Sequence, residues 1–129
     1  MTDLQTDVSQ LTFSSLCSRI EQKEGIVIEF ELKYRFHNSK HSEVFSIQAL
    51  DDVRIVSDMG CTLANLSDIF ELSEPDVSKN IKVVLSQFEI IDDDGAFIYK
   101  FDATKSIIPQ LLHYLSGIHF LYTMKIFYM

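Results

Sequence analysis

Hydrophobic and polar residues recur at regular spacings along most of the chain, and these spacings predict its secondary structure. Near the N-terminus, apolar residues suit one face of a helix that we expect to end near Gly25. The residues of that face are Leu4, Val8, Leu11, Leu16 and Ile20. From Ile26 to Phe36 every second residue is apolar and most of the residues between are charged. That alternation is typical of a half-buried strand.

Two shorter alternations follow the polar segment from His37 to Glu43, which we expect to be a hairpin loop. Their apolar residues are Phe45, Ile47 and Ala49, and then Val53 and Ile55. Together with the first strand, these segments predict a three-stranded antiparallel meander.

Helical spacing returns after Gly60, which permits a turn. Thr62 is the expected N-cap of a helix that carries Leu63, Leu66, Ile69 and Phe70. Ser73 and Pro75 indicate the start of a second helix shortly afterwards. The apolar stripe of that helix consists of Val77, Ile81, Val84, Leu85 and Phe88.

The last part of the chain predicts a hairpin and a final helix. Ile90 and Ile91 lead into three aspartates and Gly95, and an alternation of Phe97, Tyr99 and Phe101 follows. An Asp-Gly pair between two apolar runs is a strong signal for a tight hairpin turn. We expect Asp102 or Thr104 to cap the last helix, with Pro109 either in its first turn or at a kink.

The predicted fold is therefore a single α+β domain over residues 1–129: a helix, a three-stranded antiparallel meander, two helices, a β-hairpin and a C-terminal helix. A length of 129 residues suits one domain. Apolar residues make up 47% and charged residues 23% of the chain, as in ordinary globular proteins. Two cysteines far apart in sequence exclude a disulfide scaffold, and we expect both Cys17 and Cys61 to be buried.

The N-terminal segment has acidic residues and no apolar run, so we expect no secretory signal peptide and a cytoplasmic location. Residues from Ile107 to Met129 are the most apolar, but polar residues interrupt them and favour a packing helix over a membrane span. Its tail is rich in aromatic residues and methionine, which suits the core or a homodimer interface through this helix.

The excess negative charge is concentrated in one region. The formal net charge is -8, and the segment from Asp51 to Asp102 holds 12 acidic residues against 4 basic ones, while the rest is balanced. Such a region repels phosphate backbones and attracts basic partners, or it serves only as a solvated face. The candidate partner-binding residues are Asp92, Asp93, Asp94, Glu71, Glu74 and Asp76.

Two resemblances concern the middle of the chain. The order helix, turn, helix, hairpin from Thr62 to Phe101 resembles a winged-helix DNA-binding domain, with Val77 to Leu85 at the position of the recognition helix. This resemblance implies DNA contacts from the positive and polar residues Lys79, Asn80 and Lys82. The three aspartates at the tip of the expected wing oppose nucleic-acid binding.

The second resemblance rests on Asp58, Gly60, Thr62, Leu63 and Leu66, which read D-x-G-x-T-L-x-x-L after short strands. This segment resembles a bacterial and phage domain family of unknown function, the one numbered eighteen-twenty-eight in that series. In that family a strand ends in an Asp-x-Gly turn, and two helices and a hairpin follow. The resemblance covers residues from about Ile26 to the C-terminus, and Met59 replaces an expected acidic residue. It implies a source in bacteria, phage or a mobile element, and no activity.

Metal and cofactor sites are not indicated. His37 and His41 fall in the expected hairpin loop, and two loop histidines make no site. His113 and His119 are six residues apart on the last helix and suit core or interface positions. Read as a calcium loop with Gly95 at its sixth position, the aspartate run places Ile90 and Phe101 where carboxylates are required. We therefore expect no metal and no cofactor.

Catalytic signatures are equally sparse. Glu31 and Lys33 have the E-x-K spacing of one class of magnesium-dependent nucleases, but strand alternation also explains them as part of a solvated face. No phosphate-binding glycine loop, G-x-S-x-G motif or Cys-His nucleophile signature is present. The first hypothesis is a non-enzymatic acidic binding protein, an inhibitor, immunity or regulatory factor from a phage or toxin-related locus, whose partner is a basic protein surface. A dimeric winged-helix DNA-binding regulator is the alternative, and a metal-dependent nuclease is third.

Overall fold

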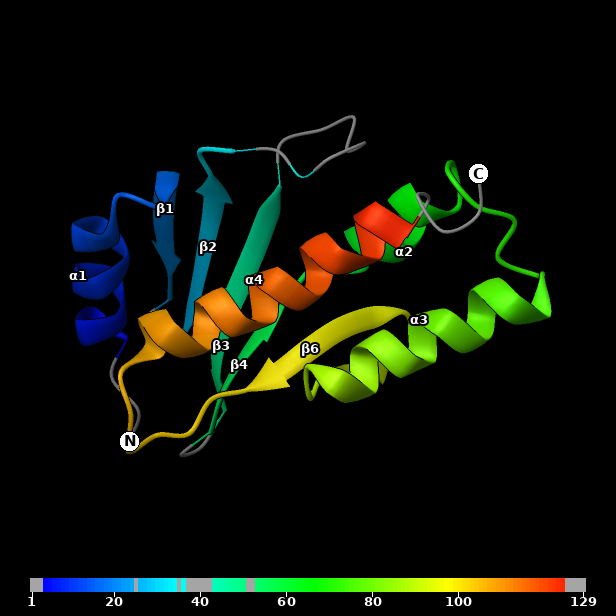
Figure 1. The fold of residues 1–129 in the computed structure, drawn as a ribbon. Helices are drawn as coiled ribbons and strands as arrows, with labels where there is room; N and C mark the ends of the chain where they lie inside the picture. Colours follow the sequence, from blue (N-terminus) through cyan, green and yellow to red (C-terminus); the bar gives the residue numbers. More distant parts are fainter. Residues whose placement is uncertain (1–3, 25, 35, 37–42, 51–52, 125–129) are drawn as a thin grey trace.

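The fold is α+β, as predicted, and the sheet is larger than the sequence indicated. The computed structural model describes residues 4–24, 26–34, 36, 43–50 and 53–124. Within these residues six strands form one antiparallel sheet in the order β1-β2-β3-β4-β6-β5, with four helices (Figure 1). The strands are β1 (Cys17–Lys23), β2 (Val27–Leu32), β3 (Val44–Leu50), β4 (Val53–Ser57), β5 (Ile91–Asp93) and β6 (Ala96–Lys100). The helices are α1 (Gln5–Ser14), α2 (Cys61–Leu66), α3 (Pro75–Gln87) and α4 (Ile107–Thr123).

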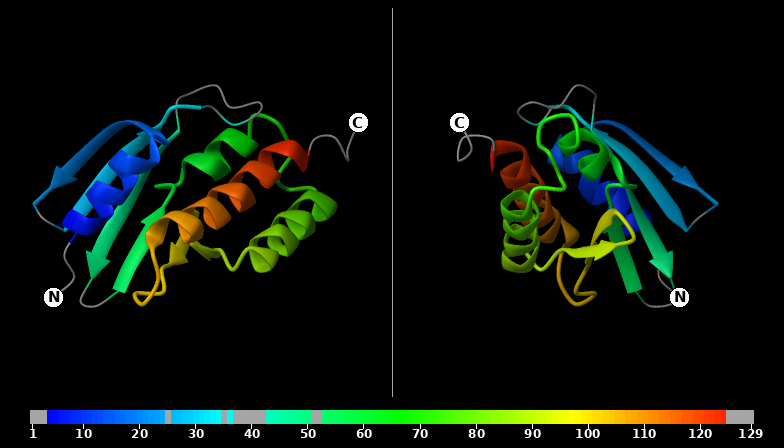
Figure 2. Two further views of the ribbon diagram at one scale, coloured as in Figure 1. Left: turned by 60° about the vertical axis from the view of Figure 1, so that its left-hand side comes forward. Right: turned by 90° about the vertical axis from the view of Figure 1, so that its right-hand side faces the viewer.

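One face of the sheet carries the core. Helix α4 crosses this face, and α1 and α3 pack beside it (Figures 1 and 2). The alternation in β2 and β3 predicted six core residues correctly: Ile28, Phe30, Leu32, Phe45, Ile47 and Ala49 are all buried. An antiparallel sheet can keep its opposite face in water, which explains the charged residues between them. The strand predicted over Ile26 to Phe36 is too long, because β2 ends at Leu32, and Ile26 and Tyr34 are exposed.

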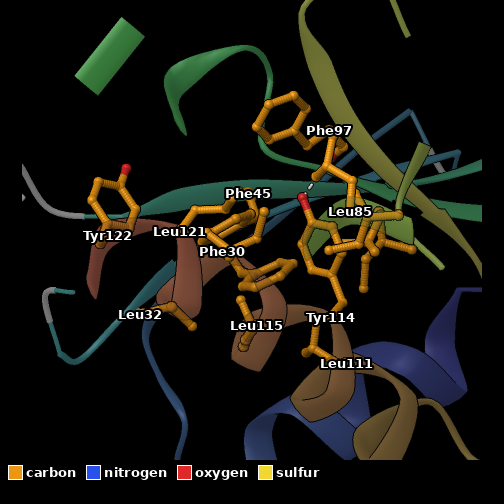
Figure 3. Packing of buried hydrophobic residues seen from close by; sticks show 14 of the residues in the cluster. Phe30, Leu32, Phe45, Leu85, Phe97, Leu111, Tyr114, Leu115, Leu121 and Tyr122 are labelled. Carbon is orange, nitrogen blue, oxygen red and sulfur yellow. Dashed lines mark hydrogen bonds between the residues drawn. The ribbon is translucent and has the colours of Figure 1, made fainter. Parts of the chain in front are cut away.

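Tyr114 of α4 joins the helix layer to the sheet. Its ring lies against Phe45 with a centroid separation of 5.9 Å, and its hydroxyl donates a hydrogen bond of 2.6 Å to the backbone oxygen of Phe97 (Figure 3). Burial raises the pKa of Tyr114 well above its ordinary value, so this hydroxyl stays protonated as a donor. Residues 107–123 of the most apolar segment thus form a packing helix, as predicted, and residues 125–129 lie outside the described residues. No helix among the described residues is long and apolar enough to cross a membrane.

The predicted N-terminal helix is too long. Helix α1 ends at Ser14, Ser15 adopts a left-handed conformation with φ 56°, and Ile20 belongs to β1. Leu16 and Ile20 are four residues apart, a spacing that fits a helix turn as well as alternate positions of a strand. Pairing with β2 decides between them, because it supplies hydrogen bonds for the backbone of β1.

The predicted meander is too short, and its last strand faces the other way. Four strands, β1 to β4, follow one another, and β6 then pairs with β4 instead of forming a separate wing. Val56 is the buried residue of β4, whereas Val53 is 39% exposed and Ile55 is half-buried. Because Val53, Ile55 and Val56 are all apolar, the alternation alone did not identify the inner face.

Two predicted helix caps are also wrong. Gly60 occupies the N-cap of α2, and Thr62 is buried within the first turn. Helix α4 begins after Ser106, where the side-chain oxygen of Gln10 from α1 accepts hydrogen bonds from the Ser106 hydroxyl and the Ile107 backbone N–H. Pro109 lies in the first turn, one of the two positions predicted. The acceptor for this helix start comes from a distant segment, which local sequence signals do not include.

Gly117 allows the end of α3 to approach α4 closely, so Gly117→Ala should destabilise the fold. A Cβ atom at this position would lie 2.7 Å from Ile90 Cδ1 and 2.7 Å from Phe88 Cγ. Overpacking of this kind costs about 1–3 kcal/mol, which exceeds the helix-propensity gain of about 1 kcal/mol from alanine. Urea unfolding of this variant, compared with Ser116→Ala on the exposed side of the same helix, measures the effect. Equal urea midpoints for the parent and Gly117→Ala would show that Phe88 and Ile90 can move aside without loss of stability.

Candidate functional site

An open hollow of about 490 Å³ lies between two turns that are far apart in sequence. One turn, residues 58–60, precedes α2, and the other, residues 94–95, joins β5 to β6. We call this feature the two-turn hollow. Its apolar lining is Met59, Leu63, Ala64, Leu72 and Ala96. The other residues that line it are Gly60, Gly95, Ser67 and Asp94, whose side chain is exposed.

Asp58 holds the first turn in place. This residue is 1% exposed, and its Oδ1 accepts hydrogen bonds from the backbone N–H groups of Gly60 at 2.8 Å and Phe97 at 2.9 Å. Its Oδ2 accepts from the N–H of Thr62 at 3.2 Å. The carboxylate therefore performs the capping role expected of Thr62 and ties the turn to β6. The D-x-G-x-T segment is a structural clamp that shapes one wall of the hollow.

The second turn is the Asp-Gly hairpin turn that the sequence predicts. Asp94 and Gly95 both have positive φ, 52° and 91°, as a two-residue hairpin of this type requires. Asp92 Oδ1 accepts a hydrogen bond of 2.8 Å from the Gly95 N–H, which fixes the turn from within. The carboxylates of Asp93 and Asp94 are exposed, and within the described part of the chain neither has a hydrogen bond or an ion pair. These two carboxylates are accessible to a partner.

The other three candidate carboxylates lie around the start of α3 and are all exposed. Glu71 accepts a hydrogen bond of 2.8 Å from the Ser73 hydroxyl, Glu74 occupies the N-cap, and Asp76 lies in the first turn. Acidic side chains there stabilise a helix through its dipole, so Glu74 and Asp76 have a local structural role. Leu72, the neighbour of Glu71, lines the two-turn hollow together with Asp94. The segment before α3 therefore lies beside the hairpin turn that joins β5 to β6.

The candidate DNA-binding residues occupy a different surface. Lys79, Asn80 and Lys82 are exposed on α3, and the two lysines line a second open hollow of about 840 Å³ along this helix. The same helix begins with Glu74 and Asp76, so its basic side chains follow directly after acidic ones. This surface combines both signs of charge, unlike the basic stripe of most DNA-binding helices.

The residues considered for nuclease activity and metal binding do not form a cluster. Glu31 Oε1 accepts a hydrogen bond of 3.1 Å from the Ser18 hydroxyl, and Lys33 lies just beyond the end of β2. Among the residues that the structure describes, no group of three or more His, Cys, Asp or Glu side chains could hold a metal ion. His113 is half-buried and its Nε2 lies 3.1 Å from the Phe88 oxygen, whereas His119 is exposed. His37 and His41 lie outside the described residues.

The two cysteines differ in their surroundings, and the prediction that both are buried is wrong for Cys61, which is exposed, and only partly correct for Cys17, which is half-buried. Cys17 is half-buried, and burial raises the pKa of its thiol to about 11, while Lys33 acts weakly in the opposite direction. Cys61 is exposed at the start of α2, and its thiol pKa is also raised, by partial burial first and then by Asp58 and Glu43. Raised pKa values keep both thiols mostly protonated at neutral pH and hence weakly nucleophilic.

Sequence reasoning identified Asp94 and the D-x-G-x-T segment but did not connect them. Leu72 and Ala96 were missed because neither belongs to a motif, and their positions beside Gly60 depend on the packing of three separate segments. The sequence feature that could have indicated the two turns is the pair of glycines, Gly60 and Gly95. Each adopts a positive φ, a conformation that favours glycine.

Comparison of the chain with protein-family models, with curated proteins and with solved structures gave no match. The resemblances to the winged-helix domain and to the bacterial and phage family stay predictions, and the geometry of the two-turn hollow carries the functional argument.

Proposed function

We propose that this protein is a non-enzymatic acidic binding module, an inhibitor, immunity or regulatory factor that engages a basic protein surface at the two-turn hollow. The observation that carries the proposal is the exposure of Asp94, which lines the hollow, and of Asp93, which precedes it in the same hairpin. Both carboxylates are exposed and unpaired within the described residues, and both belong to a hairpin held by Asp92 and by the clamp of Asp58. Rigid, solvent-exposed charges of one sign steer an oppositely charged partner to the site.

A purely structural role for these aspartates is the competing explanation. β5 is an edge strand of the sheet, and all three of its residues are exposed. Charged side chains on an edge strand discourage pairing with another sheet, so Asp92 and Asp93 also protect the protein from aggregation. Protection of this kind requires no particular partner, whereas a binding site must select one class of ligand.

The double variant Asp93→Asn/Asp94→Asn should lose binding to basic peptides without loss of stability. The side chains keep their shape, and an Asn-Gly pair suits the same hairpin turn. Short peptides are first enriched from an unbiased display library on the parent protein at low ionic strength, and their affinities are then measured with both proteins. We expect enrichment of lysine- and arginine-rich peptides, weaker binding at high salt, and at least about tenfold weaker binding to the variant, which corresponds to about 1.4 kcal/mol.

The matched control removes two exposed charges elsewhere. Glu21→Gln/Glu24→Gln changes the net charge by the same amount, at the end of β1 and just beyond it. If both double variants weaken binding equally, net charge alone attracts the peptides. Enrichment of neutral or acidic peptides would also contradict the proposal. The aspartates would then serve only to keep the edge of the sheet solvated.

The alternative function is DNA binding through α3, for which the presence of Lys79 and Lys82 beside one open hollow is the specific observation. Binding of a labelled duplex at physiological salt, weakened by Lys79→Ala/Lys82→Ala and insensitive to Asp93→Asn/Asp94→Asn, would replace the proposal above.

A further inference from the structure

We propose that the two-turn hollow is a receptor for one arginine side chain of the partner. This inference rests on the proposed function and specifies its ligand chemistry. The hollow has an apolar lining and a carboxylate in one place, and few side chains other than arginine and lysine match both properties.

The apolar part of the hollow fits the stem of such a side chain. Leu63 and Ala64 of α2 form one side, and Leu72 and Ala96 contribute from two other segments. Its volume of about 490 Å³ is large enough to admit a long side chain from an open side. Long cationic side chains bury their methylene groups against apolar surface and keep the charged end near water.

The polar part of the hollow favours a guanidinium over an ammonium group. Asp94 lines the hollow, and its side chain is exposed to solvent, so it provides a carboxylate there. A guanidinium has five N–H donors in one plane, so it can form two parallel hydrogen bonds to the two oxygens of one carboxylate. It is also less strongly hydrated than an ammonium group, which lowers the cost of approaching apolar walls.

The hollow is formed before any partner binds. Asp58 fixes the first turn through three backbone N–H groups, and Asp92 fixes the second turn through the Gly95 N–H. Gly60 and Gly95 adopt positive φ angles of 82° and 91°, which favour glycine and keep both turns in these conformations. A preformed site loses little conformational entropy on binding, which favours recognition of a single side chain.

The test uses the full chain and three small probes: N-acetylarginine methylamide and the corresponding citrulline and lysine compounds. Citrulline has nearly the shape of arginine without its charge. In ¹H–¹⁵N spectra we expect arginine to cause saturable shifts at Gly60, Ala64, Gly95 and Ala96. Citrulline should bind at least about tenfold more weakly, and lysine should bind with an affinity between the two.

Two variants locate the binding. Asp94→Asn removes the charge and keeps the turn, whereas Ala64→Leu fills the hollow from an exposed position of α2 and keeps all carboxylates. Both should abolish the arginine-induced shifts, and Glu21→Gln/Glu24→Gln should leave them unchanged. Equal shifts with citrulline, equal affinity for lysine, no saturable shift at these amides, or shifts that survive Ala64→Leu would each overturn the inference.

The peptide experiment separates this inference from the proposed function. If Ala64→Leu leaves the affinity for the selected basic peptides unchanged while Asp93→Asn/Asp94→Asn lowers it, the acidic binding surface stands and the arginine receptor is wrong. If neither variant lowers that affinity, both proposals are wrong.

Discussion

Replacement of Asp58 by alanine should lower the free energy of unfolding by about 3–4 kcal/mol. Three backbone N–H groups would lose their acceptor, those of Gly60, Thr62 and Phe97. Each donor left unsatisfied in a buried place costs about 1–3 kcal/mol, and the smaller values apply where water can enter. Since a domain of this size is stable by only about 5–15 kcal/mol, the loss would be a large part of the total.

Urea unfolding monitored by circular dichroism measures this loss, with Asp58→Asn and Asp68→Ala as comparisons. Asparagine can keep the acceptor for Gly60 and Phe97 but places an amide group near the Thr62 N–H, so its effect should be intermediate. Asp68 is exposed, and its substitution should change stability by less than about 0.5 kcal/mol. A loss below about 1 kcal/mol for Asp58→Ala would mean that the clamp does not hold the two turns together.

Arg54→Ala should destabilise the protein by about 3–5 kcal/mol. Arg54 of β4 forms an ion pair with Asp7 of α1 at 2.5 Å, and the two side chains are 12% and 0% exposed. Removal of the guanidinium takes away the charge partner that lies 2.5 Å from the buried Asp7 carboxylate, which costs more than the loss of a surface pair. The variant should therefore unfold at a clearly lower urea concentration than the parent.

A second ion pair in the protein, which is more exposed, serves as a control for the effect of burial. Lys23 and Glu29 form an ion pair of the same length, 2.5 Å, but their side chains are 47% and 26% exposed. Lys23→Ala should cost no more than about 1 kcal/mol, because solvent screens the pair. The double variant Asp7→Leu/Arg54→Met should recover most of the stability lost in Arg54→Ala, since apolar residues can replace a buried ion pair. Equal losses for Arg54→Ala and Lys23→Ala would show that Asp7 tolerates its buried charge without Arg54.

The elements with an unambiguous period could be predicted from the sequence. The alternation through Ile28, Phe30 and Leu32 identified a strand and its inner face, and the stripe of Val77, Ile81 and Val84 identified α3. The prediction failed where a spacing fitted two structures or where both strand faces were apolar. Leu16 and Ile20 illustrate the first case, and the residues of β4 illustrate the second.

The candidate site could also be predicted only in part from the sequence. Asp94 and Gly95 were predictable because a hairpin turn depends on the conformational preferences of the residues within it. Leu72 and Gly60 were not identified as their neighbours, because that contact follows from the packing of α2, the segment before α3 and the hairpin. Asp58 was visible as a motif residue, but its partner Phe97 is 39 residues away.

The sequence by itself determined the fold class, the tight Asp-Gly turn, most of the core residues and the concentration of acidic residues between Asp51 and Asp102. These properties depend on local backbone preferences and on the period of apolar residues. Only the tertiary structure decided that Cys17 to Lys23 is a strand, that β6 pairs with β4, and that two distant turns enclose one hollow. Backbone hydrogen bonds between strands and contacts between separate segments form only when the whole chain is folded, so no local pattern encodes them.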